Sequence, residues 1–355
     1  MEKKRIKYYD LMKGIAIFLV VMGHVLAMCI REVDRAFLFK FIGQVHMPIF
    51  FFISGYMTYK VAEHGGFALS KLGKRVKQLM IPFFVMSALW VWYFPHSQLE
   101  SPLHDNLPDL YRAYWKDGYW FTLCLMELCL VYWPMSWLMS RLKSVWLQVL
   151  TVVATYAVLV MLSVLFADEE ANLDLVGVGL LARFFPVFMM GVMAHRFKEG
   201  FNALWHTEGW LLASVIVFAV SFYAVVYPWD LPWLPEWTSF VTIPLMHASL
   251  MVLVLSMVEP WSNKEYAHEH KPSLLARYFN YLGNESLGIY LCHYFFLFPL
   301  GILREPVTAM GLANVPLIAI SAVVASVVIA VTLLAMRVIK CSRILSLLML
   351  GKTGK

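Results

Sequence analysis

The sequence predicts an all-α integral membrane protein with about ten transmembrane helices. Of its 355 residues, 61% are hydrophobic and only 15% are charged, whereas soluble proteins contain about 25% charged residues. This composition excludes a soluble globular enzyme, a disordered chain and a small secreted module held by disulfides. Two further observations support the fold class: the long apolar stretches, and the distribution of Lys and Arg between them.

A helix needs about 20 mostly apolar residues to cross a bilayer, and ten stretches meet this requirement. They lie near residues 10–30, 37–59, 79–95, 119–139, 145–166, 177–196, 209–227, 239–258, 284–302 and 313–336. The connections are short and no change in composition separates a soluble part. We therefore expect one transmembrane domain over residues 1–355, with a basic tail at about 337–355. The first stretch is too long for the apolar core of a cleavable signal peptide.

The basic residues predict the orientation of the chain, because Lys and Arg accumulate in cytoplasmic segments. With the N-terminus inside, 21 of the 29 Lys and Arg residues fall in inner segments and 6 in outer segments. Both termini are therefore expected in the cytoplasm, with an even number of spans. Most of the five cysteines lie in apolar stretches, so we interpret them as buried small residues and predict neither a disulfide nor a metal site.

The first span contains three polar residues that share one stripe. Ionisable groups inside a span are costly and usually functional. At 100° per residue, Lys13 and His24 differ by about 20°, and Asp10 lies within about 40° of His24. His24 is about 16 Å further along the axis than Lys13. This stripe suits a ligand with an anionic head near the cytosol and a reactive tail deeper in the membrane. A snorkelling lysine and an interhelical histidine explain it equally well.

The second span contains His46 and, after Pro48, the pair Ser54 and Gly55. Pro48 removes a hydrogen bond of the helix, and Gly55 allows close approach of a neighbouring helix. Such a break is tolerated where it lines a cavity or is packed by protein. Further polar residues within spans are Glu127, Arg183 and His247.

The predicted loop 71–77 before the third span is basic and includes Lys74 and Arg75. These side chains could hold phosphates, although attraction to anionic lipid accounts better for the composition alone. At the ninth span, Asn284 is expected to cap the helix. Tyr290 and His293 are three residues apart and share a face.

Two predicted outer segments, 96–118 and 228–238, are rich in aromatic residues, and a third, 167–174, is acidic. Aromatic and carboxylate side chains outside the membrane suit a sugar-binding surface. The aromatic belt that membrane proteins place at the lipid interface accounts for them equally well.

These residues, in this order and spacing, resemble the membrane acyltransferase-3 family, and the branch related to fucose 4-O-acetylases most. The matching motifs cover residues 5 to 293 and are Asp10-x-x-Lys13-Gly14 with His24, His46-Met47-Pro48 with Phe51-Phe52-Ile53-Ser54-Gly55, the basic run 71–77 with Arg75 and, further on, Pro82, Tyr119-Trp120-Phe121, Phe184-Phe185-Pro186 with Gly191, and Leu282-Gly283-Asn284 with Tyr290 and His293. Members carry an arginine where this chain has Lys13. The charge is kept, but the planar fork of a guanidinium is lost.

The resemblance implies a multi-pass enzyme of the bacterial inner (cytoplasmic) membrane. It would move an acetyl or other short acyl group from cytoplasmic acyl-CoA to a hydroxyl of a cell-surface or lipid-linked sugar. Acetyl-CoA is then a co-substrate, with no permanently bound cofactor, no metal and no nucleic-acid partner. The lipid bilayer would surround the enzyme, and the resemblance does not decide whether it forms a homo-oligomer.

We expect His24 to act as the general base, because an imidazole titrates near neutral pH. The full set of expected site residues is His24, Glu127 and His46 for catalysis; Lys13, Arg75, Lys74, Asp10 and Arg5 for the donor; and Ser54, Trp120, Arg183, Tyr290 and His293 for an acceptor or structural pocket. The alternative function is a proton-coupled exporter of glycan precursors or small organic acids, since intramembrane Asp, Glu and His also serve transport. Transporters often contain paired repeats with broken helices, and no convincing pair is visible.

Overall fold

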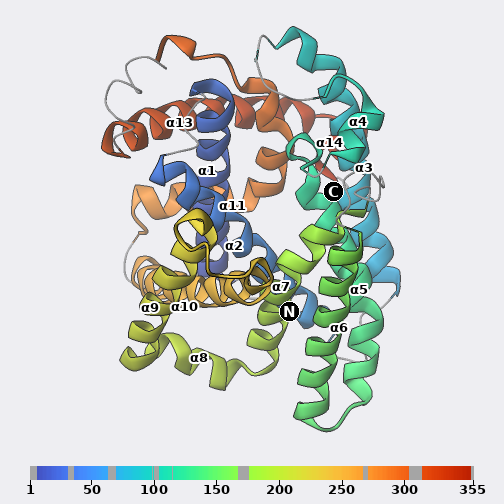
Figure 1. Cartoon of the computed structure of the whole chain (residues 1–355). Coiled ribbons are helices and arrows are strands. Elements are labelled where there is room, and N and C mark those ends of the chain that lie inside the picture. Colours follow the sequence, from blue (N-terminus) through green and yellow to red (C-terminus); the bar gives the residue numbers. More distant parts are fainter. Residues whose placement is uncertain are drawn as a thin grey trace. The chain divides into compact units, whose positions relative to one another are not determined.

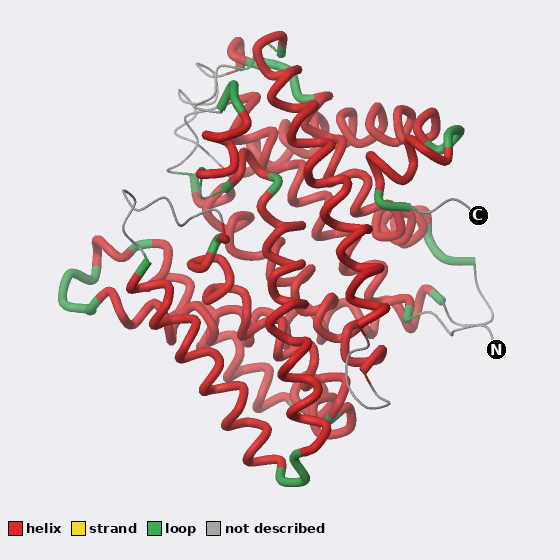
Figure 2. Tube along the Cα trace, turned by 90° about the vertical axis from the view of Figure 1, so that its right-hand side faces the viewer, coloured by secondary structure: helices red, strands yellow, loops and turns green. Residues whose placement is uncertain are grey.

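The computed structural model describes residues 6–30, 36–62, 69–97, 99, 104–113, 115–166, 176–266, 271–303 and 314–352. Helices connected by short loops make up these residues, and no strand occurs among them (Figure 2). Within the same residues, nine helices are long and apolar enough to cross a membrane. The expected all-α membrane fold is therefore confirmed, while the orientation of the termini stays a prediction.

The chain divides into two compact units. The first comprises residues 1–49, 81–107 and 257–355, and the second comprises residues 50–80 and 108–256. The helices of the first unit are α1 (Lys7–His24), η1 (Val25–Ile30), η2 (Phe94–His96), α11 (Leu274–Cys292), η8 (His293–Phe296), η9 (Gly301–Leu303), α13 (Asn314–Ile339) and α14 (Arg343–Leu350). Those of the second unit are η3 (Lys116–Gly118), α5 (Trp120–Arg141), α6 (Val145–Leu165), α7 (Val178–Arg196), α8 (Lys198–His206), α9 (Glu208–Val226), η6 (Pro228–Asp230) and η7 (Glu236–Thr238). Four helices contribute residues to both units: α2 (Phe37–Ala62), α3 (Leu69–Tyr93), α4 (Leu107–Arg112) and α10 (Ser239–Glu265).

In the first unit, α1 and α11 pack along each other (Figure 1). They touch through glycine: a Cβ at Gly14 would collide with the carbonyl oxygen of Phe279, and one at Gly283 with that of Asp10. Gly14 and Gly283 are separated by 269 positions, as are His24 and His293, which also meet. The helices are therefore parallel and in register from the glycine pair to the histidine pair.

A second glycine contact joins α2 and α7 in the second unit. A Cβ at Gly55 would collide with the carbonyl oxygen of Phe188, and one at Gly191 with that of Phe52. Small residues at such crossings let two backbones approach closely, which is a common way of associating helices in a membrane. The sequence motifs that contain these two glycines are thus explained by packing.

Two predicted boundaries are wrong. The basic stretch 71–77 is not a loop, because α3 begins at Leu69 and carries it as helix. The predicted ninth span, 284–302, corresponds to α11, which begins ten residues earlier and ends at Cys292. Asn284 lies inside this helix, and the cap is Ser273, whose hydroxyl accepts a hydrogen bond from the Ala276 amide. Hydropathy misplaced α11 because Arg277, Asn280, Asn284 and Glu285 interrupt its apolar residues, and α11 is not among the nine apolar helices found in the described residues.

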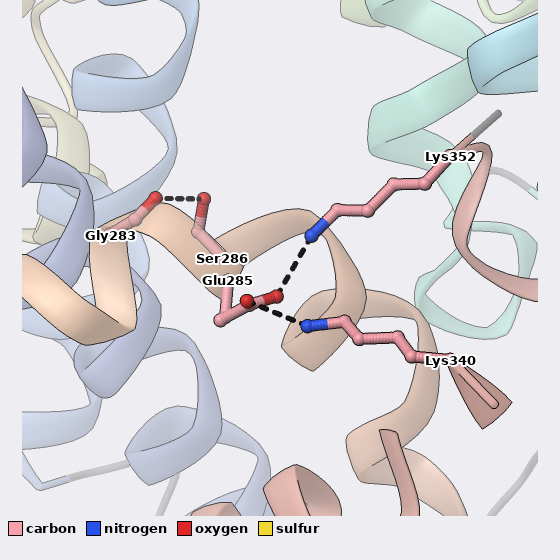
Figure 3. Close-up of polar contacts among 5 residues, drawn as sticks. All are labelled: Gly283, Glu285, Ser286, Lys340 and Lys352. Carbon is pink, nitrogen blue, oxygen red and sulfur yellow. Dashed lines mark hydrogen bonds and ion pairs between the residues drawn. The ribbon is translucent and has the colours of Figure 1, made fainter. Parts of the chain in front are cut away.

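Part of the basic tail is helical. Residues 343–350 form α14, which Ser342 caps and Gly351 ends in a left-handed conformation. On either side of α14, Lys340 and Lys352 both bind the Glu285 carboxylate of α11, at 2.7 and 2.9 Å (Figure 3). The Glu285 side chain is only 15% exposed. The tail is therefore fastened to α11 by two ion pairs that share one carboxylate.

Candidate active site

Two histidines of the first unit, His24 and His293, meet at the point where α1 and α11 both end. His24 is the last residue of α1, and a π-helical turn, η1, follows it. His293 follows the last residue of α11 and opens the 3₁₀ turn η8. π-Helical turns are rare and are often found at functional sites. Both histidines thus stand at a change of backbone geometry.

Three side chains form a chain of hydrogen bonds at this point. Nδ1 of His24 lies 2.9 Å from Nε2 of His293, and Nε2 of His24 lies 2.9 Å from the hydroxyl of Tyr294. Nδ1 of His293 lies 2.9 Å from the backbone oxygen of Ile289. His293 and Tyr294 are buried and His24 is half-buried. Both nitrogens of each imidazole are therefore engaged.

These contacts fix the direction of every hydrogen bond when both rings are neutral. The carbonyl of Ile289 can only accept, so Nδ1 of His293 must donate, and its Nε2 is left as an acceptor. Nδ1 of His24 must then donate to that Nε2. This leaves the lone pair on Nε2 of His24, where it accepts from the Tyr294 hydroxyl. The arrangement presents His24 as a base whose tautomer is set by its neighbour, the relationship that a carboxylate provides in a catalytic triad.

At the other end of α1, Asp10 and Lys13 form an ion pair. The Lys13 ammonium lies 2.8 Å from the Asp10 carboxylate, with side chains 24% and 5% exposed. Lys13 keeps access to solvent while its charge is held at the end of α1 that is predicted to face the cytoplasm.

The remaining expected residues of the first unit have different surroundings. Nδ1 of His46 donates to the backbone oxygen of Ile42 in its own helix. A Cβ at Gly23 would lie 3.1 Å from the Ile42 side chain, so this part of α2 is close to the end of α1. Tyr290 is buried, one turn before His293. Arg5 lies outside the described residues.

The other expected residues belong to the second unit. Lys74 is exposed and Arg75 half-buried, both near the start of α3. Ser54 is half-buried in α2, where its carbonyl accepts a hydrogen bond from Thr58. Trp120, at the start of α5, stacks on Phe184 with ring centroids 5.2 Å apart.

Glu127 lies on α5 in unusual surroundings. Its Oε2 is buried and has no hydrogen-bond partner among the described residues. It interacts electrostatically with Lys116, whose side chain is 1% exposed and whose ammonium donates to the carbonyl of Ala113 at 2.9 Å. Lys116 and Asp117 both adopt positive φ, 45° and 49°. Such residues cost about 1–3 kcal/mol each and gather at functional sites, so this turn belongs with Glu127 among the candidates.

Arg183 of α7 is half-buried, next to the aromatic stack. The Phe184 ring lies parallel to His247 of α10, with centroids 5.8 Å apart. His247 is 1% exposed, its Nδ1 has no hydrogen-bond partner in the described part of the chain, and it interacts electrostatically with Arg183.

Tyr294 is the residue that the sequence analysis missed. In a continuous helix, Tyr294 and His293 would point about 100° apart and could not serve one partner on the same face. Here both reach the same ring, because the two nitrogens of His24 lie on different edges of the imidazole and η8 replaces the α-helix. The signal available in the sequence was the pair His293-Tyr294 itself.

Comparison with known proteins identifies the family. The family model for the acyltransferase domain (Acyl_transf_3) matches residues 6–335. Two curated relatives are nodulation proteins named NolL. The protein of Sinorhizobium fredii is 36% identical and that of Mesorhizobium japonicum 34% identical, each over 116 residues. Each match covers 30% of this chain and 31% of the relative, so the chain spans less than a third of the curated relatives it matches. No solved structure matches.

The family match is much longer than either match to a relative, and it includes the glycine contact of α1 with α11, the two histidines and Tyr294. Because it extends over most of the chain, the protein belongs to the acyltransferase-3 family of multi-pass membrane proteins, which confirms the expected class of enzyme, an acyltransferase.

Proposed function

We propose that this protein is an O-acetyltransferase of the bacterial inner membrane that uses cytoplasmic acetyl-CoA as donor and a hydroxyl of a cell-surface or lipid-linked sugar as acceptor. The single observation that supports it most is the directed pair of histidines. A half-buried imidazole whose Nδ1–H is held by an acceptor and whose Nε2 already accepts from a hydroxyl, at 2.9 Å in both cases, is arranged to take a proton from an alcohol.

The proposed reaction starts when the sugar hydroxyl replaces the Tyr294 hydroxyl at Nε2 of His24. His24 removes the hydroxyl proton as the sugar oxygen forms a bond to the thioester carbonyl carbon. The bond from that carbon to sulfur then breaks, the sulfur takes the proton from Nε2, and the products are the sugar ester and CoA. While His24 carries the extra proton, its hydrogen bond to Nε2 of His293 becomes charge-assisted and stronger.

The donor's phosphates are assigned to basic residues at the predicted cytoplasmic side. Lys13, oriented by Asp10, provides one cation, and Lys74, Arg75 and Arg5 are proposed to provide others. The guanidinium of Arg75 can bind a phosphate with two parallel hydrogen bonds, which an ammonium cannot do. Glu127 and His46 stay candidates for proton transfer, and Ser54, Trp120, Arg183 and Tyr290 for the acceptor pocket.

The test is acetyl transfer from labelled acetyl-CoA to the deacetylated surface polysaccharide of the host, measured with membranes that contain His24→Ala. We expect transfer to fall to background, because the variant lacks Nε2 of His24, the atom proposed to remove the proton from the sugar hydroxyl. A matched control is His195→Ala, since His195 also lies in a helix and donates from Nδ1 to a backbone oxygen, that of Tyr56, at 2.8 Å. Full transfer by His24→Ala at normal protein level would remove His24 from the mechanism. Flux of an unmodified precursor without acetyl transfer would favour the exporter.

A further inference from the structure

A cavity in the second unit is lined by α7, α9, α10 and the segment that joins α9 to α10. Its volume is about 600 Å³, within the range of about 300–1,000 Å³ typical of small-molecule sites. The joining segment contains two 3₁₀ turns, η6 and η7, and supplies three prolines to the wall, Pro228, Pro232 and Pro235. Proline fixes φ, so this wall is stiff before any ligand arrives.

Hydrogen bonds within the segment stiffen it further. The Tyr223 hydroxyl at the end of α9 donates to the Asp230 carboxylate at 3.0 Å. The Thr238 hydroxyl donates to the carbonyl of Pro235 at 2.6 Å. Binding to a wall that is already ordered loses little conformational entropy.

The lining is mostly aliphatic, and an aromatic ring and a few polar groups are added to it. Trp229 is 91% exposed and lines the cavity, as do Arg183 and Glu236, and hydroxyls come from Ser239 and Thr242. A guanidinium donates in a fixed fork and a carboxylate accepts at two oxygens, so together they can bind adjacent hydroxyls. An indole ring provides a flat apolar surface with little entropy to lose.

A cavity in the first unit shows what an apolar lining looks like in this protein. It has a volume of about 230 Å³ and is lined by residues such as Met86, Leu89, Phe295 and Met349, with no charged side chain. That lining suits hydrocarbon. The cavity of the second unit, with its cation, carboxylate and hydroxyls, does not resemble it.

We infer that the cavity lined by Arg183, Trp229 and Glu236 binds a sugar ring of the acceptor glycan. A sugar ring offers an apolar face of C–H groups to Trp229 and vicinal hydroxyls to Arg183 and Glu236. The inference deepens the proposed function and rests on it. The cavity serves to hold the glycan, whereas the chemistry is assigned to His24.

The joining segment also contains the matched control for this inference. Trp229, Trp233 and Trp237 are all strongly exposed, at 91%, 73% and 64%, but only Trp229 lines the cavity. If the three residues act only as an aromatic belt at the lipid interface, replacing any one of them should have a similar effect. If the cavity binds sugar, replacing Trp229 should weaken glycan binding and replacing Trp233 should not.

The experiment measures binding of deacetylated host polysaccharide fragments and of methyl α-L-fucopyranoside to the purified full chain in nanodiscs, without acetyl-CoA. Trp229→Ala should weaken binding by about two- to tenfold, the range that an aromatic contact provides. Arg183→Gln should weaken it as well, and Trp233→Ala should leave it unchanged. In the transfer assay, Trp229→Ala should raise KM for the glycan and leave KM for acetyl-CoA and kcat unchanged.

Equal loss of binding in Trp229→Ala and Trp233→Ala would overturn the inference. Displacement of the glycan by phosphatidylglycerol would also overturn it, because it would assign the cavity to a lipid headgroup. Because binding is measured without acetyl-CoA, a failure of the proposal that the cavity binds sugar is distinguishable from a failure of the proposal that the protein transfers acetyl groups. If acetyl transfer depends on His24 but Trp229→Ala binds glycan normally, only the assignment of this cavity as the sugar site is refuted.

Discussion

The hydrogen bond between the two histidines allows the sharpest test of the mechanism. Nδ1 of His24 donates to Nε2 of His293 at 2.9 Å, and His293 has no exposed surface. Bulk water therefore does not replace His293 as the acceptor of this hydrogen bond. The bond stabilises His24 when it carries the extra proton. Hydrogen bonds to charged groups contribute about 1.5–3 kcal/mol, and each ~1.4 kcal/mol corresponds to tenfold in rate. His293→Leu should therefore lower kcat by about 10- to 150-fold.

The matched variant is His293→Gln, because its amide oxygen can reach the position of Nε2 and accept the same hydrogen bond. It should retain more activity than His293→Leu, with KM for acetyl-CoA unchanged in both. The structural readout is ¹⁵N NMR of labelled histidine in membranes. Wild-type His24 should carry its proton on Nδ1, and the second tautomer should appear in the leucine variant. Wild-type kcat in His293→Leu, or a proton on Nε2 of His24 in the unmodified protein, would refute the reasoning.

Three further predictions concern the surroundings of this pair. Tyr294→Phe should change kcat by less than about tenfold, the value of one neutral hydrogen bond, because the acceptor replaces this hydroxyl; a larger loss in the transfer assay would place the phenol in the chemistry. Gly283→Ala should lower the melting temperature in detergent more than Gly288→Ala, since the first added methyl meets the backbone of Asp10 and the second only the movable end of a methionine. Glu285→Gln should speed proteolysis within α14, because two ion pairs are lost, whereas the exposed Glu208→Gln should not.

The sequence was sufficient to predict the local arrangement of α1. Lys13 and His24 lie in one unbroken helix, so the estimate of 100° per residue applies to both. The π-helical turn begins only at Val25, beyond the stretch that the estimate covered. Asp10 and Lys13 lie three residues apart in this helix and form an ion pair.

What the sequence could not supply is the partner of each functional residue. His24 and His293 are 269 positions apart, and no local pattern relates them. Hydropathy also misled in this region. It selects apolar windows, whereas α11 contains Arg277, Asn280, Asn284 and Glu285 and is stabilised by the Ser273 cap and by packing against α1. Capping and tertiary contact outweighed hydropathy there.

The contact of the two glycines sets the distance between the helices that carry the two histidines. Gly14 and Gly283 precede His24 and His293 by ten residues each, about 15 Å along parallel helices. A side chain at either glycine would push the helix axes apart. A hydrogen bond of 2.9 Å between imidazoles is broken when its donor and acceptor move apart by a further ~1 Å.

Beyond the histidines the chain leaves α-helical geometry in both helices. There the amide of Leu300 donates to the carbonyl of Cys29 at 2.9 Å, which fastens the segment after η8 to the end of η1. The histidine pair is thus held from both sides by backbone contacts, which is the rigidity that a positioned base requires. It follows that replacements at Gly14 or Gly283 should impair acetyl transfer without touching a reacting group.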